Sequence, residues 1–264
     1  MEVEMNKVNV DGINIAYDRK GKGLPLILIH GYPLDHTTWN GVVSSISDEF
    51  DLIVPDLRGF GESDVMEADD SIVDYASDMA GLLDHLKIKK ATLVGHSMGG
   101  YVALAFAREY PDRISGLGMV SSQILADTKE RKEGRIATAK QVLEEGVNPV
   151  VESMTPKLSK KIQIQDIVRS LISKQRPLGI YSALNAMAER PDSTELFTTF
   201  KYPTVIVHGD EDELIPVERG REMKAALPSA HYVELAGLGH MAMMEDPKAV
   251  ADALRFFVNV KVKT

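Results

Sequence analysis

The sequence predicts an α/β fold in which a mostly parallel, eight-stranded sheet is flanked by helices. Two observations lead to this prediction: short apolar runs recur along the chain, and helical patterns of apolar residues separate most of them. Strands that alternate with helices are typical of parallel sheets, because a parallel connection has to cross a face of the sheet. A third observation is that 264 residues with 44% hydrophobic content are enough to bury one sizeable core.

The N-terminal part is predicted to form a β-hairpin at one edge of the sheet. Residues 6–21, NKVNVDGINIAYDRKG, alternate apolar and polar side chains on both sides of Asp11-Gly12. An Asp-Gly pair between two alternating segments is the strongest short signal for a tight hairpin turn. We therefore expect two antiparallel strands here, before the parallel part of the sheet begins.

Six further strands and four core helices follow from the pattern. The strand segments are short and apolar, as expected for strands that are buried on both faces. They cover residues 24–29, 51–56, 91–95, 116–122, 203–209 and 231–235. The helical segments cover residues 71–87, 98–110, 217–227 and 247–258.

The alternation of strands and helices breaks between residues 123 and 199. This stretch is rich in Lys, Glu, Ala and Leu, is interrupted by prolines and contains no convincing strand. A strand pattern resumes at residue 203, which favours a helical insertion over a separate helical domain. We therefore expect a core formed by residues 1–122 and 200–264. Residues 123–199 are expected to form a helical lid, or cap, over the carboxyl ends of the core strands.

Composition and charge narrow the classes of function and location. The formal net charge of −9 argues against a nucleic-acid surface, which needs clustered Lys and Arg. The lack of cysteine excludes disulfides and thiolate metal sites and is compatible with a reducing cytoplasm. The start, MEVEMNKVNV, has acids where a signal peptide has bases, and no apolar run is long enough to span a bilayer. We expect a soluble, cytoplasmic protein with no nucleic-acid or membrane partner.

A serine between glycines is the candidate nucleophile. In VGHSMGGYVAL (94–104), Ser97 follows an apolar strand and precedes a helical pattern, so it lies at a strand-to-helix turn. Gly95 and Gly99, two positions away on either side, supply the lack of bulk that such a turn needs. This G-x-S-x-G pattern is the nucleophile elbow, which lifts one hydroxyl above the end of a sheet. Taken alone, it also fits a serine that only caps a helix.

Two later loops supply the candidate base and acid. A serine hydroxyl needs a base to take its proton and an acid to orient that base, here in the order Ser, Asp, His. His240 follows the last strand, and four acids follow the strand before it: Asp210, Glu211, Asp212 and Glu213. Asp210 is so close to the strand end that we expect it to brace the turn, and both glutamates are expected to face solvent. Asp212 is therefore the preferred acid, and Asp210 is the second choice.

Backbone N–H groups beside Ser97 are expected to hold the oxyanion of an acyl transfer. One is the N–H of Met98, directly after the nucleophile. The other comes from the loop HGYPLDHTTW (30–39), where Gly31 permits a turn and Tyr32 then offers its N–H. The alternative is that this loop only forms a turn.

Five segments together resemble the α/β-hydrolase superfamily along essentially the whole core. They are IHGYPLDHTTW, VPDLRGFGESD, VGHSMGGYVAL, VIVHGDEDELIP and GLGHMAMMEDP. Within the superfamily the chain is similar to small bacterial esterases, cofactor-free haloperoxidase-type perhydrolases and enol-lactonases. The resemblance implies a triad of Ser97, Asp212 and His240, because Asp212 occupies the place of the family's G-x-x-D pattern before a proline. These motifs are specific for the fold and the triad and carry little information on the substrate.

Differences from sister families narrow the reaction. Haloalkane dehalogenases and epoxide hydrolases have an aspartate at the elbow, where this chain has Ser97. Hydroxynitrile lyases of this fold place a lysine after the histidine, and carbon–carbon bond hydrolases place a tryptophan, whereas this chain has Met241. Ester hydrolysis is therefore the favoured reaction, and lactonase, carbon–carbon hydrolase and perhydrolase activities stay as alternatives on the same triad. Pro33, directly after Tyr32, contributes to the resemblance to the perhydrolases.

The substrate pocket is predicted to be formed by Tyr32, Pro33, Met98 and Met241. Tyr32 and Pro33 belong to the oxyanion loop. The two methionines lie beside the elbow and the histidine, where thioethers fill irregular apolar spaces. The charged stretch TKERKEGRIATAK (128–140) is expected to be a solvated face of the lid, and the alternative is a basic surface that recruits the substrate. The expected substrates are small, largely uncharged carboxylic esters. An alternative from another class is a small-molecule receptor that retains the triad for binding.

No cofactor or metal is expected. No set of histidines and carboxylates has the spacing of metal ligands along the chain, and no H-E-x-x-H motif occurs. Three further histidines near the site, His30, His96 and His208, are expected to brace loops or to pack locally. No sequence feature determines the oligomeric state.

Overall fold

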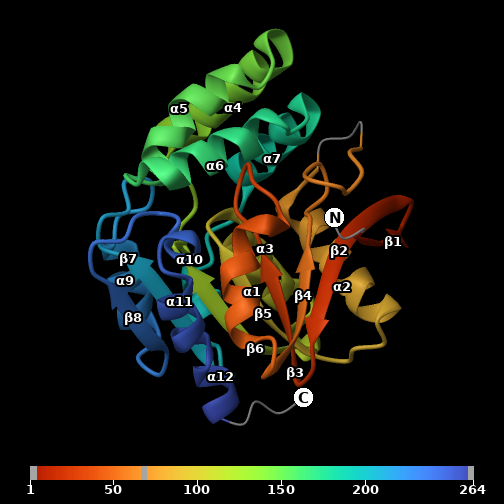
Figure 1. Cartoon of the computed structure of the whole chain (residues 1–264), viewed down its shortest axis with the longest axis vertical. Coiled ribbons are helices and arrows are strands. Elements are labelled where there is room, and N and C mark those ends of the chain that lie inside the picture. Colours follow the sequence, from red (N-terminus) through yellow and green to blue (C-terminus); the bar gives the residue numbers. More distant parts are fainter. Residues whose placement is uncertain (1–4, 67–69, 261–264) are drawn as a thin grey trace.

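Eight strands form one sheet, in the order β1-β2-β4-β3-β5-β6-β7-β8 (Figure 1). The computed structural model describes residues 5–66 and 70–260, so the first four residues, which belong to the acidic start noted above, lie outside the described part. β1 pairs antiparallel with β2 and β2 with β4, and every other pair is parallel. The mostly parallel, eight-stranded sheet is therefore confirmed. The strands are β1 (Asn6–Val10), β2 (Ile13–Gly21), β3 (Leu24–Ile29), β4 (Phe50–Pro55), β5 (Ala91–His96), β6 (Ile114–Val120), β7 (Thr204–Gly209) and β8 (His231–Leu235).

Two strands differ from the prediction for identifiable reasons. β6 ends at Val120 instead of residue 122, because Ser121 has a φ of +46°, which takes the backbone out of the extended conformation. β8 is partly exposed instead of buried on both faces, because it is an edge strand that pairs only with β7. Its charged and polar residues suit an edge that faces water.

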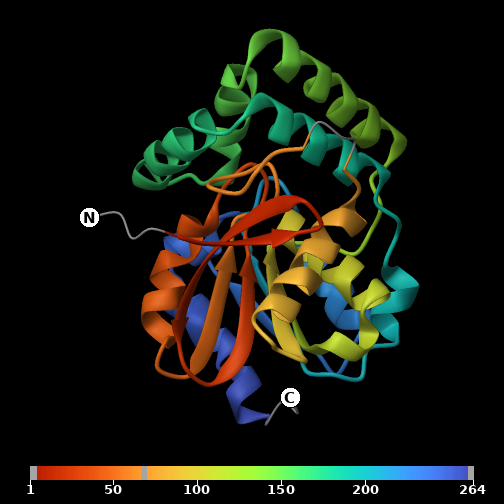
Figure 2. The ribbon, with the colours of Figure 1, turned by 90° about the vertical axis from the view of Figure 1, so that its right-hand side faces the viewer.

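Helices cover both faces of the sheet. Figure 2 shows the sheet between α1 and α11 on one side and α2 and α3 on the other. The four core helices predicted from the sequence are all present, but residues 247–258 form two helices, α11 and α12. Two short helices, α1 and α10, were not predicted. The core helices are α1 (Asn40–Ile46), α2 (Ile72–His85), α3 (Met98–Glu109), α9 (Glu218–Ala226), α10 (Ala242–Glu245), α11 (Pro247–Leu254) and α12 (Phe256–Asn259).

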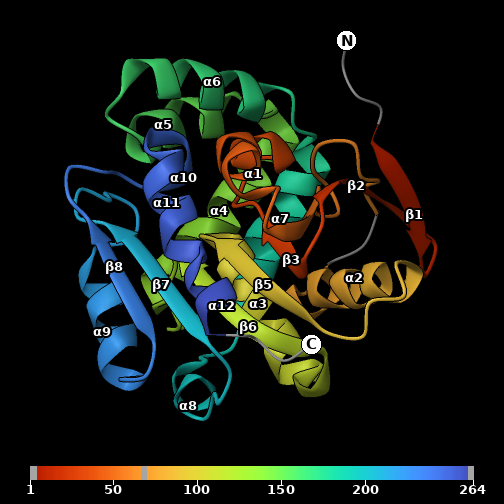
Figure 3. The ribbon, with the colours of Figure 1, turned by 60° about the horizontal axis from the view of Figure 1, so that its bottom comes forward.

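The segment between β6 and β7 is helical, as predicted. Four of its helices, α4 (Lys129–Glu145), α5 (Asn148–Leu158), α6 (Ile162–Ser173) and α7 (Pro177–Glu189), gather at one end of the molecule (Figure 1). The fifth, α8 (Thr194–Thr198), lies at the other end, beside α9 (Figure 3). We use the word cap below for α4 to α7. Within the described residues, none of the helices combines the length and apolar character needed to cross a lipid bilayer.

Cap helix α7 meets the core at a close backbone contact. A Cβ on Gly179 of α7 would lie 2.1 Å from the carbonyl oxygen of Gly59, in the loop after β4. The same loop is held by Arg58, which donates to Asp70 and Asp78 at 2.7 Å each. Ser182, one turn further along α7, donates to Asp70 at 2.7 Å. This loop therefore joins the cap to the core and fixes the position of α7.

Candidate active site

Ser97 lies at the turn between β5 and α3. Its φ of +51° and ψ of −114° are outside the regions that L residues ordinarily adopt, which is a conformation that only surrounding structure can maintain. A Cβ on Gly95 would lie 2.1 Å from the Gly99 carbonyl oxygen, and one on Gly99 would lie 2.4 Å from the Ile29 carbonyl oxygen. Backbone approaches this close leave no room for side chains, which explains both glycines of the motif. Ser97 itself is half-buried and lines a cavity.

His240 and Asp212 are joined by a short hydrogen bond. Nδ1 of His240 donates to Oδ2 of Asp212 at 2.7 Å, and the N–H groups of Leu214 and Ile215 donate to Oδ1 at 2.9 Å each. Nε2 of His208 lies 3.4 Å from Oδ2. Burial alone would raise the pKa of Asp212, but the charge of His240 and hydrogen bonds from His208, His240 and Ile215 hold that pKa well below its ordinary value. Asp212 is thus a buried carboxylate that holds Nδ1 of His240, and none of the described residues is hydrogen-bonded to the other ring nitrogen, Nε2.

The other acids of the same loop are engaged elsewhere. Oδ1 of Asp210 accepts a hydrogen bond from the Gly237 N–H at 2.7 Å, so Asp210 ties two loops together. Glu211 and Glu213 are exposed and lie 3.2 and 3.7 Å from Nζ of Lys160, which follows α5. Among the described residues, none of these three carboxylates is hydrogen-bonded to His240.

His96, directly before Ser97, connects the elbow to the histidine loop. Its Nε2 donates to the carbonyl oxygen of His240 at 3.0 Å, and the two ring centroids are 4.8 Å apart. Burial, reinforced by the charge of His240, lowers the pKa of His96 well below its ordinary value. His96 was predicted to pack or bond locally in preference to catalysing; its hydrogen-bond partner lies 144 residues away, and no sequence pattern indicates it. Within the described chain no hydrogen bond joins the Ser97 hydroxyl to His240; such bonds often form only once substrate is bound.

The predicted oxyanion donors belong to Met98, next to Ser97 in the chain, and to Tyr32, in a loop that lies against the elbow. A Cβ on Gly31 would lie 2.5 Å from Nδ1 of His96 and 3.1 Å from Cβ of Ser97, so the loop after β3 lies against the elbow. Met98 is the first residue of α3, and its N–H therefore has no intrahelical acceptor. Neither this N–H nor that of Tyr32 donates to an acceptor among the described residues. Both N–H groups are therefore unengaged within the described protein, as the donors of an oxyanion hole have to be.

A cavity of about 380 Å³ lies between the elbow and the cap. Ser97 and Tyr32 line it from the core. Much of the remaining wall is apolar and comes from α5, α7 and the loop after β7: Val150, Met154, Leu184, Met187, Leu214 and Ile215. Its size and mixed lining are those of a small-molecule site.

The structure places one of the four predicted pocket residues at the cavity. Tyr32 lines the cavity, whereas Pro33, Met98 and Met241 do not. Met98 and Met241 are fully buried and belong to the hydrophobic core, and Pro33 is buried too. The sequence placed these residues near the elbow, but the direction of each side chain depends on packing that a pattern does not show.

One group of residues has the geometry of a metal site. Ligand atoms of Asp35, His36 and Asp56 lie within 4.8 Å of one another, although the sequence suggested no such set. Protein donors already occupy these atoms: Nδ1 of His36 bonds Oδ1 of Asp56 at 2.8 Å, and Oδ1 of Asp35 accepts from the N–H of Thr37 at 3.0 Å. The hydrogen bonds of this group therefore brace the loop after β3.

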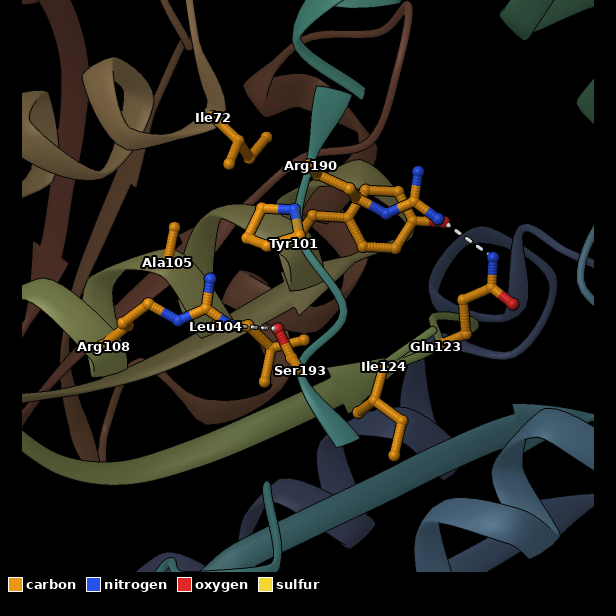
Figure 4. A pocket seen from close by; sticks show the side chains of 10 residues that line it. Ile72, Tyr101, Leu104, Ala105, Arg108, Gln123, Ile124, Arg190 and Ser193 are labelled. Atoms are coloured by element: carbon orange, nitrogen blue, oxygen red, sulfur yellow. Dashed lines mark hydrogen bonds between the residues drawn. The ribbon is translucent and has the colours of Figure 1, made fainter. Parts of the chain in front are cut away.

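A smaller pocket of about 10 Å³ lies at the base of the cap (Figure 4). The Arg190 guanidinium lies 4.0 Å from the centre of the Tyr101 ring, and Arg108 donates to Oγ of Ser193 at 3.2 Å. This volume holds about one water molecule. No nucleophile with an adjacent base lines it, so it is a junction between the cap and the core.

Known proteins are similar to this chain in sequence, in fold or in both. A thermophilic esterase from Thermogutta terrifontis, solved with malate bound, is 38% identical, with a TM-score of 0.92 and 99% of both chains covered. A non-heme chloroperoxidase of Kitasatospora aureofaciens is 27% identical, with 90% of this chain and 93% of that protein covered. The enol-lactonase from Burkholderia xenovorans LB400 has the same fold, at 23% identity and a TM-score of 0.88 over 96% of this chain and 100% of its own.

The family assignment rests on most of the chain. Residues 25–247 match the alpha/beta hydrolase fold family. This range begins in β3, includes the cap and contains the loops that carry Ser97, Asp212 and His240. The chain therefore belongs to the alpha/beta hydrolase fold family.

Proposed function

We propose that this protein is a serine hydrolase that cleaves carboxylic esters through an acyl-enzyme on Ser97. The observation that carries the proposal is the 2.7 Å hydrogen bond between His240 and the buried carboxylate of Asp212. It gives the imidazole the orientation of a general base, in a chain whose elbow serine faces a cavity. The 38% identical esterase from Thermogutta terrifontis supports the same class of reaction.

In the acylation half of the reaction, Oγ of Ser97 attacks the ester carbonyl carbon while Nε2 of His240 takes the hydroxyl proton. The N–H groups of Tyr32 and Met98 bind the negative oxygen of the tetrahedral intermediate, where each such donor contributes about 3 kcal/mol in serine hydrolases. Asp212 stabilises the imidazolium. The C–O bond to the alcohol then breaks, and His240 returns its proton to the departing alcohol oxygen.

Deacylation repeats these steps with water. His240 takes a proton from a water molecule, whose oxygen attacks the acyl carbon, and the same two N–H groups bind the new oxyanion. The bond to Oγ of Ser97 breaks, Oγ recovers the proton from His240, and the carboxylic acid leaves. Each of the two steps uses the same donors and the same base.

The proposal is tested by covalent labelling and turnover together. A fluorophosphonate probe should attach to Ser97, identified by peptide mass spectrometry, and Ser97→Ala should lose both labelling and hydrolysis of p-nitrophenyl butyrate. Ser45→Ala, at an exposed serine of α1 whose hydroxyl donates to the Gly41 carbonyl, is the matched control and should keep both. Wild-type protein that neither labels nor hydrolyses esters would instead support a receptor.

The relatives suggest two further reactions, perhydrolysis and lactone hydrolysis. The chloroperoxidase is similar in sequence and the enol-lactonase shares this fold. The same nucleophile, base and oxyanion donors can transfer an acyl group to peroxide or open a lactone. Formation of peracetic acid from acetate and hydrogen peroxide, and hydrolysis of a panel of lactones, should be compared with ester hydrolysis. A higher kcat/KM for either reaction would replace ester hydrolysis as the primary activity.

A further inference from the structure

Three basic side chains line the cavity, and no acidic side chain lines it among the described residues. Arg131 and Arg135 come from α4, and Lys157 comes from α5. The whole chain has 39 acidic and 30 basic residues, so a wall with basic residues only is opposite to the average composition. A cavity of this kind attracts negatively charged groups.

The positive residues lie on one face of α4. Arg131, Gly134, Arg135 and Thr138 all line the cavity, at the spacing of three and four residues that places side chains on the same side of a helix. The segment 128–140 was predicted to be a solvated face; Arg131 and Gly134 are exposed, and these four positions also face the cavity. The helix is charged around most of its circumference, so its sequence does not indicate which face meets the cavity.

The protein neutralises only part of this positive charge. The buried carboxylate of Asp127 accepts hydrogen bonds from Arg135 at 2.5 Å and Arg190 at 2.9 Å, and lies 4.0 Å from Nε of Arg131. Burial alone would raise the pKa of Asp127, but Arg190 and Arg135 hold that pKa below its ordinary value. Three guanidinium groups thus share one carboxylate. Lys157 has no ion-pair partner in the described part of the chain.

Tyr32 adds an unused polar group to the same wall. Its phenol oxygen is buried and has no hydrogen-bond partner among the described residues. Burial raises the pKa of this phenol, and the charge of Arg135 opposes that rise, which places Arg135 within electrostatic reach of Tyr32. A buried hydroxyl without a partner is unfavourable, and a bound acceptor would relieve it.

We infer that the cavity selects esters that carry a second, negatively charged group, and that this group is a carboxylate bound by Arg131, Arg135 and Lys157. The inference rests on the proposed ester hydrolysis and specifies its substrate class as monoesters of dicarboxylic acids. Guanidinium groups match carboxylates with two parallel hydrogen bonds, and the apolar wall accommodates the carbon chain between the two ends of such a substrate. This class replaces the largely uncharged esters expected from the sequence.

The test compares two esters of nearly equal shape. Monomethyl adipate carries a carboxylate, and the methyl ester of adipic acid monoamide carries a neutral amide in its place. The wild-type kcat/KM, measured by methanol release, should be higher for monomethyl adipate by about tenfold, the effect of one hydrogen bond to a charged group. Arg131→Gln and Lys157→Gln should each reduce this ratio, and the double variant should bring it close to one.

A neighbouring lysine provides the control. Lys132 follows Arg131 on α4, pairs with Glu189 at 2.6 Å and does not line the cavity. Lys132→Gln removes the same charge from the same helix and should leave the ratio of the two esters unchanged. Arg131, Lys132 and Lys157 all have solvent-accessible side chains, so we expect every variant to fold. Thermal melts of all variants check this.

The outcomes separate this inference from the proposed function. Hydrolysis of both esters with a wild-type ratio near one, or a ratio that the double variant does not change, overturns the carboxylate site and leaves ester hydrolysis intact. If neither these esters nor p-nitrophenyl butyrate is hydrolysed, ester hydrolysis itself is contradicted, and the site is tested by binding. Adipate should then bind Ser97→Ala protein in titration calorimetry about tenfold more tightly than it binds Ser97→Ala that also carries the double substitution. Equal binding overturns the inference.

Discussion

Two aspartates separated by one residue have different environments. Asp212 is buried and receives hydrogen bonds from His240 and two backbone N–H groups, whereas Asp210 is exposed and receives one from Gly237. The difference follows from position: Asp210 is directly after β7, and Asp212 lies far enough along the loop to reach the loop after β8. Only Asp212 is placed to set the tautomer of the base.

Asparagine at position 212 should therefore reduce catalysis far more than asparagine at position 210. Asp212→Asn keeps the shape of the side chain but favours the wrong imidazole tautomer, and a comparable change in a serine protease costs on the order of 10⁴ in kcat. Asp210→Asn should change kcat by less than about tenfold, since it alters a surface turn. Steady-state kinetics on one aryl ester are sufficient, and the reverse order of the two variants would assign the acid to Asp210.

The pair of His36 and Asp56 should make stability depend on pH. Burial alone would lower the pKa of His36, but its hydrogen bond to Asp56 raises that pKa above its ordinary value. Burial alone would raise the pKa of Asp56, but His36 lowers it. The stabilisation from His36 is full below about pH 6.5 and is lost as pH rises through its folded-state pKa; that from Asp56 is full above about pH 4 and is lost on further acidification.

The predicted measurement is the free energy of unfolding in urea for His36→Phe and wild type. The variant should be less stable by about 1–2 kcal/mol near pH 5.5, where the pair is charged, and the difference should narrow above about pH 8. His36→Asn, which keeps a neutral donor near the position of Nδ1, should show a weaker pH dependence. A difference between His36→Phe and wild type that is constant from pH 5 to pH 9 would show that the pair contributes no charge interaction.

At the scale of helices and strands, periodicity was sufficient for most of the core. Apolar runs located all eight strands and the long helices, because burial imposes a regular spacing on the residues involved. The short helix α1 was missed, since its seven residues provide less than two full periods. Ser97, Asp212 and His240 could be predicted as site residues because the elbow and the strand ends are local features. The directions of the Met98 and Met241 side chains and of the arginines of α4 could not be predicted, because they depend on partners distant in sequence.

Two glycines in the cap helices should respond in opposite ways to alanine. A Cβ at Gly179 would meet the Gly59 carbonyl oxygen at 2.1 Å, so Gly179→Ala should destabilise the protein by about 1–3 kcal/mol through overcrowding. A Cβ at Gly134 would meet no atom within 4 Å, so Gly134→Ala should stabilise α4 by about 0.5–1 kcal/mol. Chemical denaturation of the two variants checks both signs. If Gly179→Ala were as stable as the wild type, α7 would not rest on the Gly59 loop in solution.

At the scale of the whole molecule, charge is distributed unevenly. The chain has a net charge of −9, yet the described residues that line the cavity include three cations and no anion. An anionic substrate is therefore repelled by the molecule at long range and attracted by the cavity at short range. Added salt weakens both effects, but the contacts within the cavity determine binding once the substrate has entered.

Salt should accordingly distinguish the charged ester from the neutral one. Between about 0.01 M and about 1 M NaCl the screening length falls from about 30 Å to about 3 Å, so kcat/KM for monomethyl adipate should decrease several-fold. The value for the monoamide ester should stay nearly constant. The two substrates are assayed side by side in the same buffer series. Parallel salt curves for the two esters would indicate that the cavity cations do not contact the substrate.

The shared carboxylate of Asp127 has a consequence for the unliganded protein. Arg131, Arg135 and Arg190 repel one another, and Asp127 reduces this repulsion without cancelling it. The unfavourable work of bringing like charges together is therefore done during folding, before any ligand arrives, and a binding anion meets groups that are already in position. Preorganisation of this kind makes the free protein less stable than an uncharged cavity would, so recognition of a carboxylate and maximal stability are opposing properties of this cap.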